Sequence, residues 1–144
     1  MTDWTTSTVQ TNGITLHYQR TGGAKPPVVL CHGFSDCHVA WTRTAQALAD
    51  AFDLIMVDAR GHGYSDKPAS GYSATDHAAD IAGLIAALDL GQPALLGHSM
   101  GAATVAQLAA DYPHLARRIV LEDPPWRDAT GMPNDRGAQL QKLV

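Results

Sequence analysis

The pentapeptide Gly97-His98-Ser99-Met100-Gly101 decides how this sequence is interpreted. The short apolar run Ala94 to Leu96 precedes it, and Met100 to Tyr112, a helical stretch rich in small residues, follows it. A serine between a buried strand and a helix, with glycine two positions before and after, matches the G-x-S-x-G turn that exposes a nucleophile. The pattern therefore predicts a strained Ser99 in front of a helix N-terminus. The alternative is a plain loop of small residues joining two core elements.

Upstream of this turn, the chain shows strand patterns. The β-branched and aromatic runs Trp4 to Gln10 and Ile14 to Arg20 flank Thr11-Asn12-Gly13, which predicts a hairpin because Asn and Gly tolerate positive φ. Pro27 to Cys31 and Asp53 to Asp58 are apolar throughout their centres, as expected of strands that helices cover on both faces.

Helical patterns alternate with these strands. Val39 to Phe52 has apolar residues at helical spacing, and Ser73 to Asp76 resembles a capping box in front of a second helix with a stripe of Ile81, Leu84, Ile85 and Leu88. Arg118 to Leu121 is one more strand. The order predicts an α/β fold of about six strands, a mostly parallel sheet that opens with an antiparallel hairpin and carries helices on both faces.

Composition excludes several classes of protein. The 144 residues carry a net charge of −4 without any basic block, which argues against binding to nucleic acid or to anionic lipid. No run of eighteen apolar residues occurs, so no membrane-spanning helix is expected, and the first residues lack the features of a signal peptide. Two cysteines, Cys31 and Cys37, are too few for a disulfide framework and lack metal-site spacing. A cytoplasmic protein without a metal is the expectation.

Three further stretches extend the pattern of the pentapeptide. His32-Gly33-Phe34 follows the third strand, Asp58 to Asp66 reads D-A-R-G-H-G-Y-S-D after the fourth, and Leu121 to Pro124 ends the sixth. Together with the serine turn, these stretches resemble the α/β-hydrolase superfamily, in its serine esterase, lipase and acyl-transfer branch. The resemblance runs from about Val9 to Trp126 and implies the N-terminal part of that fold.

The resemblance implies a function and a set of site residues. Ser99 would attack the carbonyl of a small acyl substrate such as a carboxylic ester, and the backbone N–H groups of Phe34 and Met100 would form the oxyanion hole. Water would then release the acyl group, and no cofactor is needed. The remaining pocket and loop residues expected from the resemblance are His32, Gly33, His98 and Trp126.

The rest of a catalytic triad is not found in this sequence. In this fold the acid and then the histidine follow the nucleophile along the chain. Asp123 is a possible acid, although a structural role in holding loop backbone is favoured, and His114 precedes the strand that should come before the acid. His32 and His62 are expected to bond loop backbone and to line the pocket mouth, whereas His17, His38 and His77 stand in no recognisable pattern.

The end of the sequence resembles an interruption of the fold. We expect residues 1–123 to form the hydrolase core and residues 124–144 to begin a cap segment. A complementary C-terminal half, in the same chain or in a separate polypeptide, would then supply the missing triad residues. Other possibilities are a catalytically silent ligand-binding relative and a perhydrolase or carbon–carbon bond hydrolase with the same serine. Family members with an aspartate nucleophile, the dehalogenases and epoxide hydrolases, are disfavoured because position 99 is serine.

Overall fold

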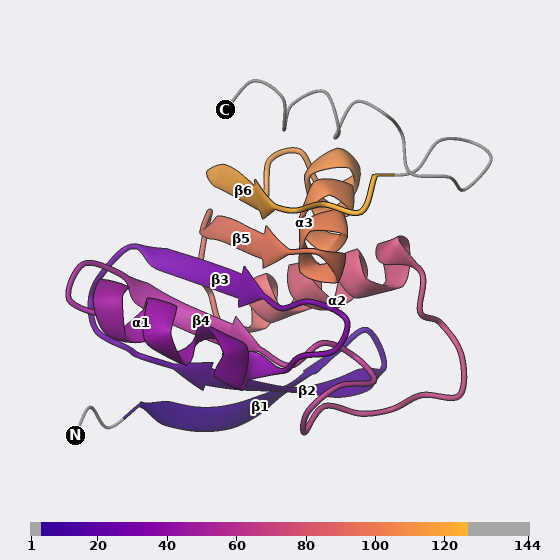
Figure 1. The fold of residues 1–144 in the computed structure, drawn as a ribbon, viewed down its shortest axis with the longest axis horizontal. Helices are drawn as coiled ribbons and strands as arrows, with labels where there is room; N and C mark the ends of the chain where they lie inside the picture. The colour runs from indigo at the N-terminus through magenta and orange to yellow at the C-terminus, as the bar shows by residue number, and fades with distance from the viewer. Residues whose placement is uncertain (1–3, 127–144) are drawn as a thin grey trace.

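The computed structural model describes residues 4–126, which form a six-stranded sheet with helices on both faces (Figure 1). The strands are β1 (Thr5–Thr11), β2 (Ile14–Arg20), β3 (Pro27–Cys31), β4 (Asp53–Val57), β5 (Ala94–His98) and β6 (Arg118–Glu122). The helices are the 3-10 helix η1 (His38–Trp41), α1 (Thr42–Leu48), α2 (Ala74–Ala87) and α3 (Met100–Asp111). The expected start of a cap falls largely on residues 127–144 and lies outside the described residues.

The sheet has the strand order β1-β2-β4-β3-β5-β6. β1 pairs with β2, and β2 with β4, in antiparallel fashion, whereas the β3–β4, β3–β5 and β5–β6 pairs are parallel. The predicted fold class is therefore confirmed, including the opening hairpin. Its turn places Asn12 at φ 48° and Gly13 at φ 76°, the two positive values that an Asn-Gly turn accommodates.

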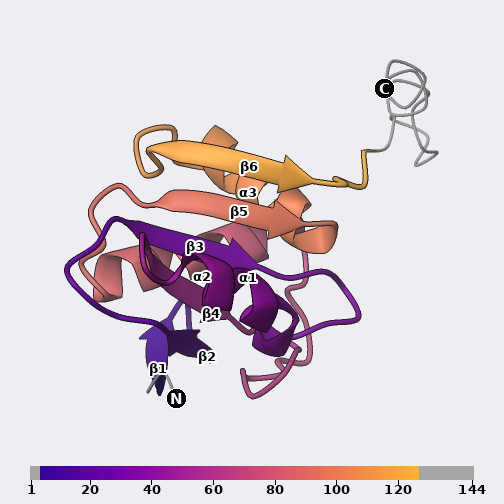
Figure 2. The same ribbon diagram turned by 60° about the vertical axis from the view of Figure 1, so that its left-hand side comes forward.

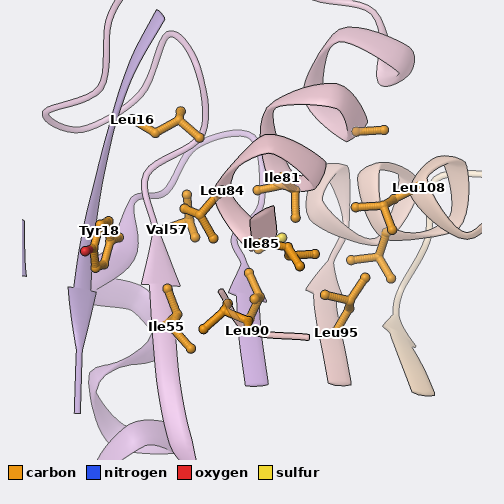
Figure 3. Packing of buried hydrophobic residues seen from close by; sticks show 14 of the residues in the cluster. Leu16, Tyr18, Ile55, Val57, Ile81, Leu84, Ile85, Leu90, Leu95 and Leu108 are labelled. Atoms are coloured by element: carbon orange, nitrogen blue, oxygen red, sulfur yellow. The ribbon is translucent and has the colours of Figure 1, made fainter. Parts of the chain in front are cut away.

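Each face of the sheet packs against its own helices, and Figures 1 and 2 both show α1 on one side and α2 and α3 on the other. Successive residues of β4 alternate between the two cores: Leu54 and Met56 pack toward η1 and α1, and Ile55 and Val57 toward α2 and α3. Figure 3 shows this second, larger core, where Leu84 and Ile85 of α2 meet the sheet. Burial on both faces explains the continuous apolar runs of the central strands.

The helix predicted from the apolar pattern is confirmed at α2, whereas the one predicted at α1 is longer than the observed helix. The capping box is confirmed: the Ser73 Oγ accepts from the Asp76 N–H at 3.2 Å, and the Asp76 carboxylate accepts from the Ser73 N–H at 2.9 Å. The predicted helix from Val39 to Phe52 instead divides into η1 and α1 and ends at Leu48. The chain must turn back before β4 begins, and the Phe52 N–H bonds to the Leu48 carbonyl in that turn.

The parallel arrangement brings four loops to one edge of the sheet. The carboxyl ends of β3, β4, β5 and β6 point the same way, so the segments that follow them are neighbours in space (Figure 2). Open parallel sheets place ligand sites at this edge. Within residues 4–126, no helix is both long enough and apolar enough to cross a bilayer.

Candidate active site

Ser99 lies on a sharp bend between β5 and α3. Its backbone has φ 51° and ψ −114°, a conformation that non-glycine residues rarely adopt, and its N–H donates to the Glu122 carbonyl at 2.9 Å. A Cβ on Gly97 would collide with the backbone of Gly101, and a Cβ on Gly101 would collide with the carbonyl of Cys31. Both glycines are therefore required, because α3 packs its backbone directly against β3 and β5.

The two backbone groups predicted to bind an oxyanion lie beside the same cleft as Ser99. Phe34 and Met100 line this cleft of about 440 Å³ together with the serine. Neither the Phe34 nor the Met100 N–H donates to another group within residues 4–126. Met100 is the first residue of α3, whose N–H groups and dipole favour negative charge at this end. The cleft is thus lined by a serine with a strained backbone and by two residues whose N–H groups have no acceptor in this part of the chain.

The remaining walls of the cleft come from the loop after β4, from α2 and from α3. Besides the three residues above, they are His62, Tyr72, Ala74, His77, Ala103, Thr104 and Pro125. Sequence reasoning did not identify Tyr72 or His77 as cleft residues. The capping box could have done so, since it begins α2 at the edge of the sheet where the loops meet.

His32 holds the loop after β3 rather than lining the Ser99 cleft. It is buried, with its Nδ1 2.7 Å from the Gly33 carbonyl and its Nε2 accepting from the Ala59 N–H at 3.0 Å. These partners fix the neutral tautomer with the proton on Nδ1. Burial lowers the pKa of His32 below its ordinary value, against the raising effect of the Gly33 carbonyl. The Gly33 carbonyl belongs to the peptide unit whose N–H is that of Phe34.

His98 and Glu122 line a second hollow, on the other side of the elbow. They are paired across β5 and β6, so their side chains leave the same face of the sheet. The hollow measures about 290 Å³ and also includes Gly33 and Asp36. Trp126 is 45% exposed near the end of the described chain and does not line the Ser99 cleft, which its neighbour Pro125 reaches.

Asp123 follows β6 at the same edge of the sheet. It has φ 47° and is exposed, and its carboxylate makes no hydrogen bond within residues 4–126. The structural role expected for it, a bond to nearby loop backbone, is therefore not present in this part of the chain. His114 lies exposed after α3, at the opposite end of β6 from Asp123. Neither side chain makes a hydrogen bond to Ser99.

Asp58 gathers two histidines that the sequence did not connect. His17 of β2 donates from Nδ1 to one carboxylate oxygen at 2.8 Å, and His38 of η1 reaches the other at 2.9 Å. The backbone N–H groups of His38 and Tyr64 bond the same two oxygens at 2.6 and 3.0 Å. Burial opposes the Asp58 charge, but the backbone bonds from Tyr64 and His38 and the His38 ring together hold the pKa of this carboxyl below its ordinary value.

The same three side chains have ligand atoms within 4.8 Å of one another, as a metal site requires. Each carboxylate oxygen of Asp58, however, already accepts two hydrogen bonds. An ion would have to displace both imidazole protons from a buried and satisfied carboxylate. The cluster is complete as a structural anchor for the loop after β4.

A buried ion pair fixes the same loop to α2. The Arg60 guanidinium binds the Asp80 carboxylate through two contacts of 2.6 Å, and it also bonds the Gly71 carbonyl. The Asp80 side chain raises the pKa of Arg60 against the lowering effect of burial. Asn12 of the hairpin turn donates to Asp80 at 2.9 Å. The start of the loop after β4 is thus held by Asp58 and Arg60, and the bond from Arg60 to Gly71 ties in its far end.

Comparison with known proteins assigns this architecture to one family. The family described as the alpha/beta hydrolase fold matches residues 26–143. The 2-(acetamidomethylene)succinate hydrolase of Mesorhizobium japonicum is 44% identical over 110 residues, which are 76% of this chain and 39% of that protein. The N-formylmaleamate deformylase of Pseudomonas putida is 40% identical over 118 residues, which are 81% of this chain and 44% of that protein.

The crystal structure of Epoxide Hydrolase A from Mycobacterium thermoresistibile is similar over nearly the whole chain. It superimposes with a TM-score of 0.82 at 29% identity, covering 98% of this chain and 45% of that one. The chain spans about two fifths of the length of the relatives named above. These proteins are therefore similar to this chain in the part of the fold that carries the elbow.

Proposed function

Since this chain belongs to the α/β-hydrolase fold family, we propose that it carries the nucleophile and the oxyanion hole of a serine hydrolase acting on a small acyl compound. The observation that carries the proposal is the strained backbone of Ser99, at φ 51°, beside a cleft that it shares with Phe34 and Met100. Such a conformation costs about 1 to 3 kcal/mol and is a frequent feature of functional sites.

The reaction follows from these groups. The Ser99 Oγ attacks the acyl carbonyl, and its proton passes to a general base supplied by the rest of the protein. The Phe34 and Met100 N–H groups bind the negative oxygen of the tetrahedral intermediate, and each such donor stabilises the transition state by about 3 kcal/mol. The leaving group departs with a proton, and water then attacks the acyl-serine by the same route.

Serine at position 99 favours an acyl substrate over an epoxide. A serine that opened an epoxide would form an ether, and an ether has no carbonyl carbon that water can attack. An acyl-serine is an ester, which water hydrolyses. The names of the two relatives from Mesorhizobium and Pseudomonas denote an acetamido-substituted succinate and a formyl derivative of maleamate, both N-acyl compounds. They support a substrate with an acyl group.

We also propose that a complementary part of the protein supplies the acid, the histidine and the cap. β6 is the last strand of the described sheet, and Ile119 and Val120 on it are 40% and 54% exposed. An unpaired strand edge with apolar side chains favours pairing with another segment. Intact mass measurement of the natural protein tests this: we expect a component well above 15.3 kDa or a second polypeptide.

The nucleophile is tested with a fluorophosphonate probe and Ser99→Ala. In the natural protein, we expect the probe to add its mass to the tryptic peptide that contains Ser99. The Ser99→Ala variant should lose both labelling and hydrolysis of p-nitrophenyl acetate, by about 10³-fold or more in kcat. An unlabelled, folded protein with no hydrolysis would instead favour a silent ligand-binding relative, and labelling at another residue would refute the assignment.

A further inference from the structure

We infer that His62 is a positioning residue of the oxyanion hole, acting on the loop that carries the Phe34 N–H. This inference rests on the function proposed above. His62 lies on the loop after β4, and its Nε2 is 2.7 Å from the Phe34 carbonyl oxygen. It therefore reaches across from a different loop to Phe34, a residue that lines the Ser99 cleft.

The two peptide units around Phe34 are each held by a histidine. The carbonyl of the peptide unit that contains the Phe34 N–H belongs to Gly33, and this carbonyl accepts a hydrogen bond from the His32 Nδ1 at 2.7 Å. The carbonyl of the next peptide unit belongs to Phe34 itself, and the His62 Nε2 lies within hydrogen-bond distance of it. Fixing the planes on both sides of a residue fixes its φ and ψ, because each peptide unit is rigid. The direction of the Phe34 N–H is thereby set before substrate binds.

His62 is anchored firmly enough to impose that direction. Its Nδ1 lies 2.9 Å from the Arg60 carbonyl, and the Arg60 side chain is fixed by the buried ion pair with Asp80. Its own N–H donates to the Ala59 carbonyl at 2.9 Å. The His62 ring also packs edge-on against the Phe34 ring, with centroids 5.8 Å apart. The Phe34 side chain is 76% exposed, so these contacts, and not burial, hold the residue in place.

The hydrogen-bond partners of His62 also decide which ring nitrogen must carry a proton for the clamp to form. Both ring nitrogens face carbonyl oxygens, and a carbonyl oxygen can only accept. Hydrogen bonds at both positions require a proton on both nitrogens, whereas a neutral ring keeps one of the two. The clamp on Phe34 exists only while Nε2 carries its proton.

Two substitutions separate the clamp from simple loop stability. In His62→Gln, the side-chain amide nitrogen takes the place of Nε2 and can still donate to the Phe34 carbonyl. In His62→Asn, it takes the place of Nδ1 and can reach only the Arg60 carbonyl. We expect His62→Asn and His62→Ala to lower kcat for p-nitrophenyl acetate by about 10- to 100-fold with KM within about twofold, because a misdirected donor acts mainly in the transition state.

His62→Gln should stay within about threefold of the natural protein in kcat, since the donor to Phe34 is retained. His114→Gln, the same exchange at an exposed position, serves as the matched control. Unfolding midpoints in urea are measured for all variants, so that a loss of kcat can be compared with a loss of stability. Equal kcat values for His62→Gln and His62→Asn, or losses that follow the unfolding midpoints, would overturn the inference.

A measurement on the unaltered protein keeps the inference testable if a variant does not fold. In ¹⁵N NMR of the imidazole nitrogens, we expect a proton on His62 Nε2 at the pH of the assay. An unprotonated Nε2 there would refute the clamp. Ser99→Ala separates the two proposals: if it keeps full hydrolysis, the serine mechanism fails and His62 has no role in it. If it is inactive while the His62 variants are unaffected, only the present inference fails.

Discussion

Two groups of polar residues at the carboxyl edge of the sheet use hydrogen bonds in opposite ways. Around Asp58, two imidazoles and two backbone N–H groups saturate one buried carboxylate. Around Ser99, the hydroxyl and the N–H groups of Phe34 and Met100 have no acceptor within residues 4–126, and the three residues line one cleft. The first group resembles a catalytic or metal cluster in its residue types, and the second consists of one serine and two amides.

The difference teaches where chemistry can occur in this fold. A buried donor or acceptor that is fully paired contributes stability and cannot bind a substrate without losing that pairing. Donors without a protein partner beside an open cleft stay available, and they bind a negative oxygen when one forms there. The Asp58 cluster therefore holds the loop of His62 in place, and the Ser99 cleft is the part available to a ligand.

Replacing the centre of the saturated group should have the largest effect on stability. Asp58→Asn removes the charge and places an amide donor against groups that are themselves donors, so we expect a loss of about 3 kcal/mol in the free energy of unfolding. Urea denaturation measures this loss. Asp50→Asn, at an exposed aspartate after α1, should change the value by less than about 0.5 kcal/mol. Similar losses for both variants would contradict the anchoring role of Asp58.

The open group should respond in the opposite direction. Ser99 adopts φ 51° and its side chain caps no helix N–H, so removing its Cβ relieves strain without losing an internal bond. We expect Ser99→Gly to be about 1 kcal/mol more stable than Ser99→Ala, because glycine accepts this conformation and alanine does not. The comparison is made by urea denaturation at one pH. A Ser99→Ala variant as stable as Ser99→Gly would show that the elbow stores no strain.

The sequence was sufficient for most of the fold and for the elbow, and physical reasons limit the rest. β4 and the Asn12-Gly13 turn follow local rules, apolar runs and positive φ, that depend little on distant residues. The Asp58 cluster was missed because His17 and His38 come from separate segments, 41 and 20 positions from Asp58, and meet only through β2–β4 pairing and the entry into η1. Spacing along the chain carries no signal for such a contact.

The same limit, that contacts between distant residues leave no local pattern, explains which site residues could be predicted. Ser99, Met100 and their glycines form one continuous motif, so their arrangement could be predicted from it. His77 lies on α2, whose start at this edge the capping box indicates, whereas Tyr72 lies on the loop after β4, which the contact between Arg60 and Asp80 anchors. That anchor is a tertiary contact between residues 20 positions apart, and no periodic pattern in the sequence predicts it.

His77 offers the smallest and most specific test of the contrast between the two groups. It is buried like His17 and His38, yet its ring makes no hydrogen bond within residues 4–126. Burial lowers the pKa of His77 below its ordinary value, with the nearby Asp80 carboxylate opposing that shift. At His77 the unfolded chain therefore binds more protons than the folded one as pH falls below about 6.5, so the contribution of His77 makes the free energy of unfolding fall with pH in that window.

His77→Gln removes this titration, so the free energy of unfolding should decline less steeply between pH 7 and pH 5 than in the natural sequence. Burial also lowers the pKa of His32, so part of the decline should remain in the variant. Between about pH 8 and 7.5 the two curves should run parallel, because His77 is neutral in both states there. An unchanged slope below pH 7 would mean that His77 holds its proton as readily in the folded cleft as in the unfolded chain. The contrast between a buried, unpaired imidazole and the saturated Asp58 cluster would then have no measurable consequence at this position.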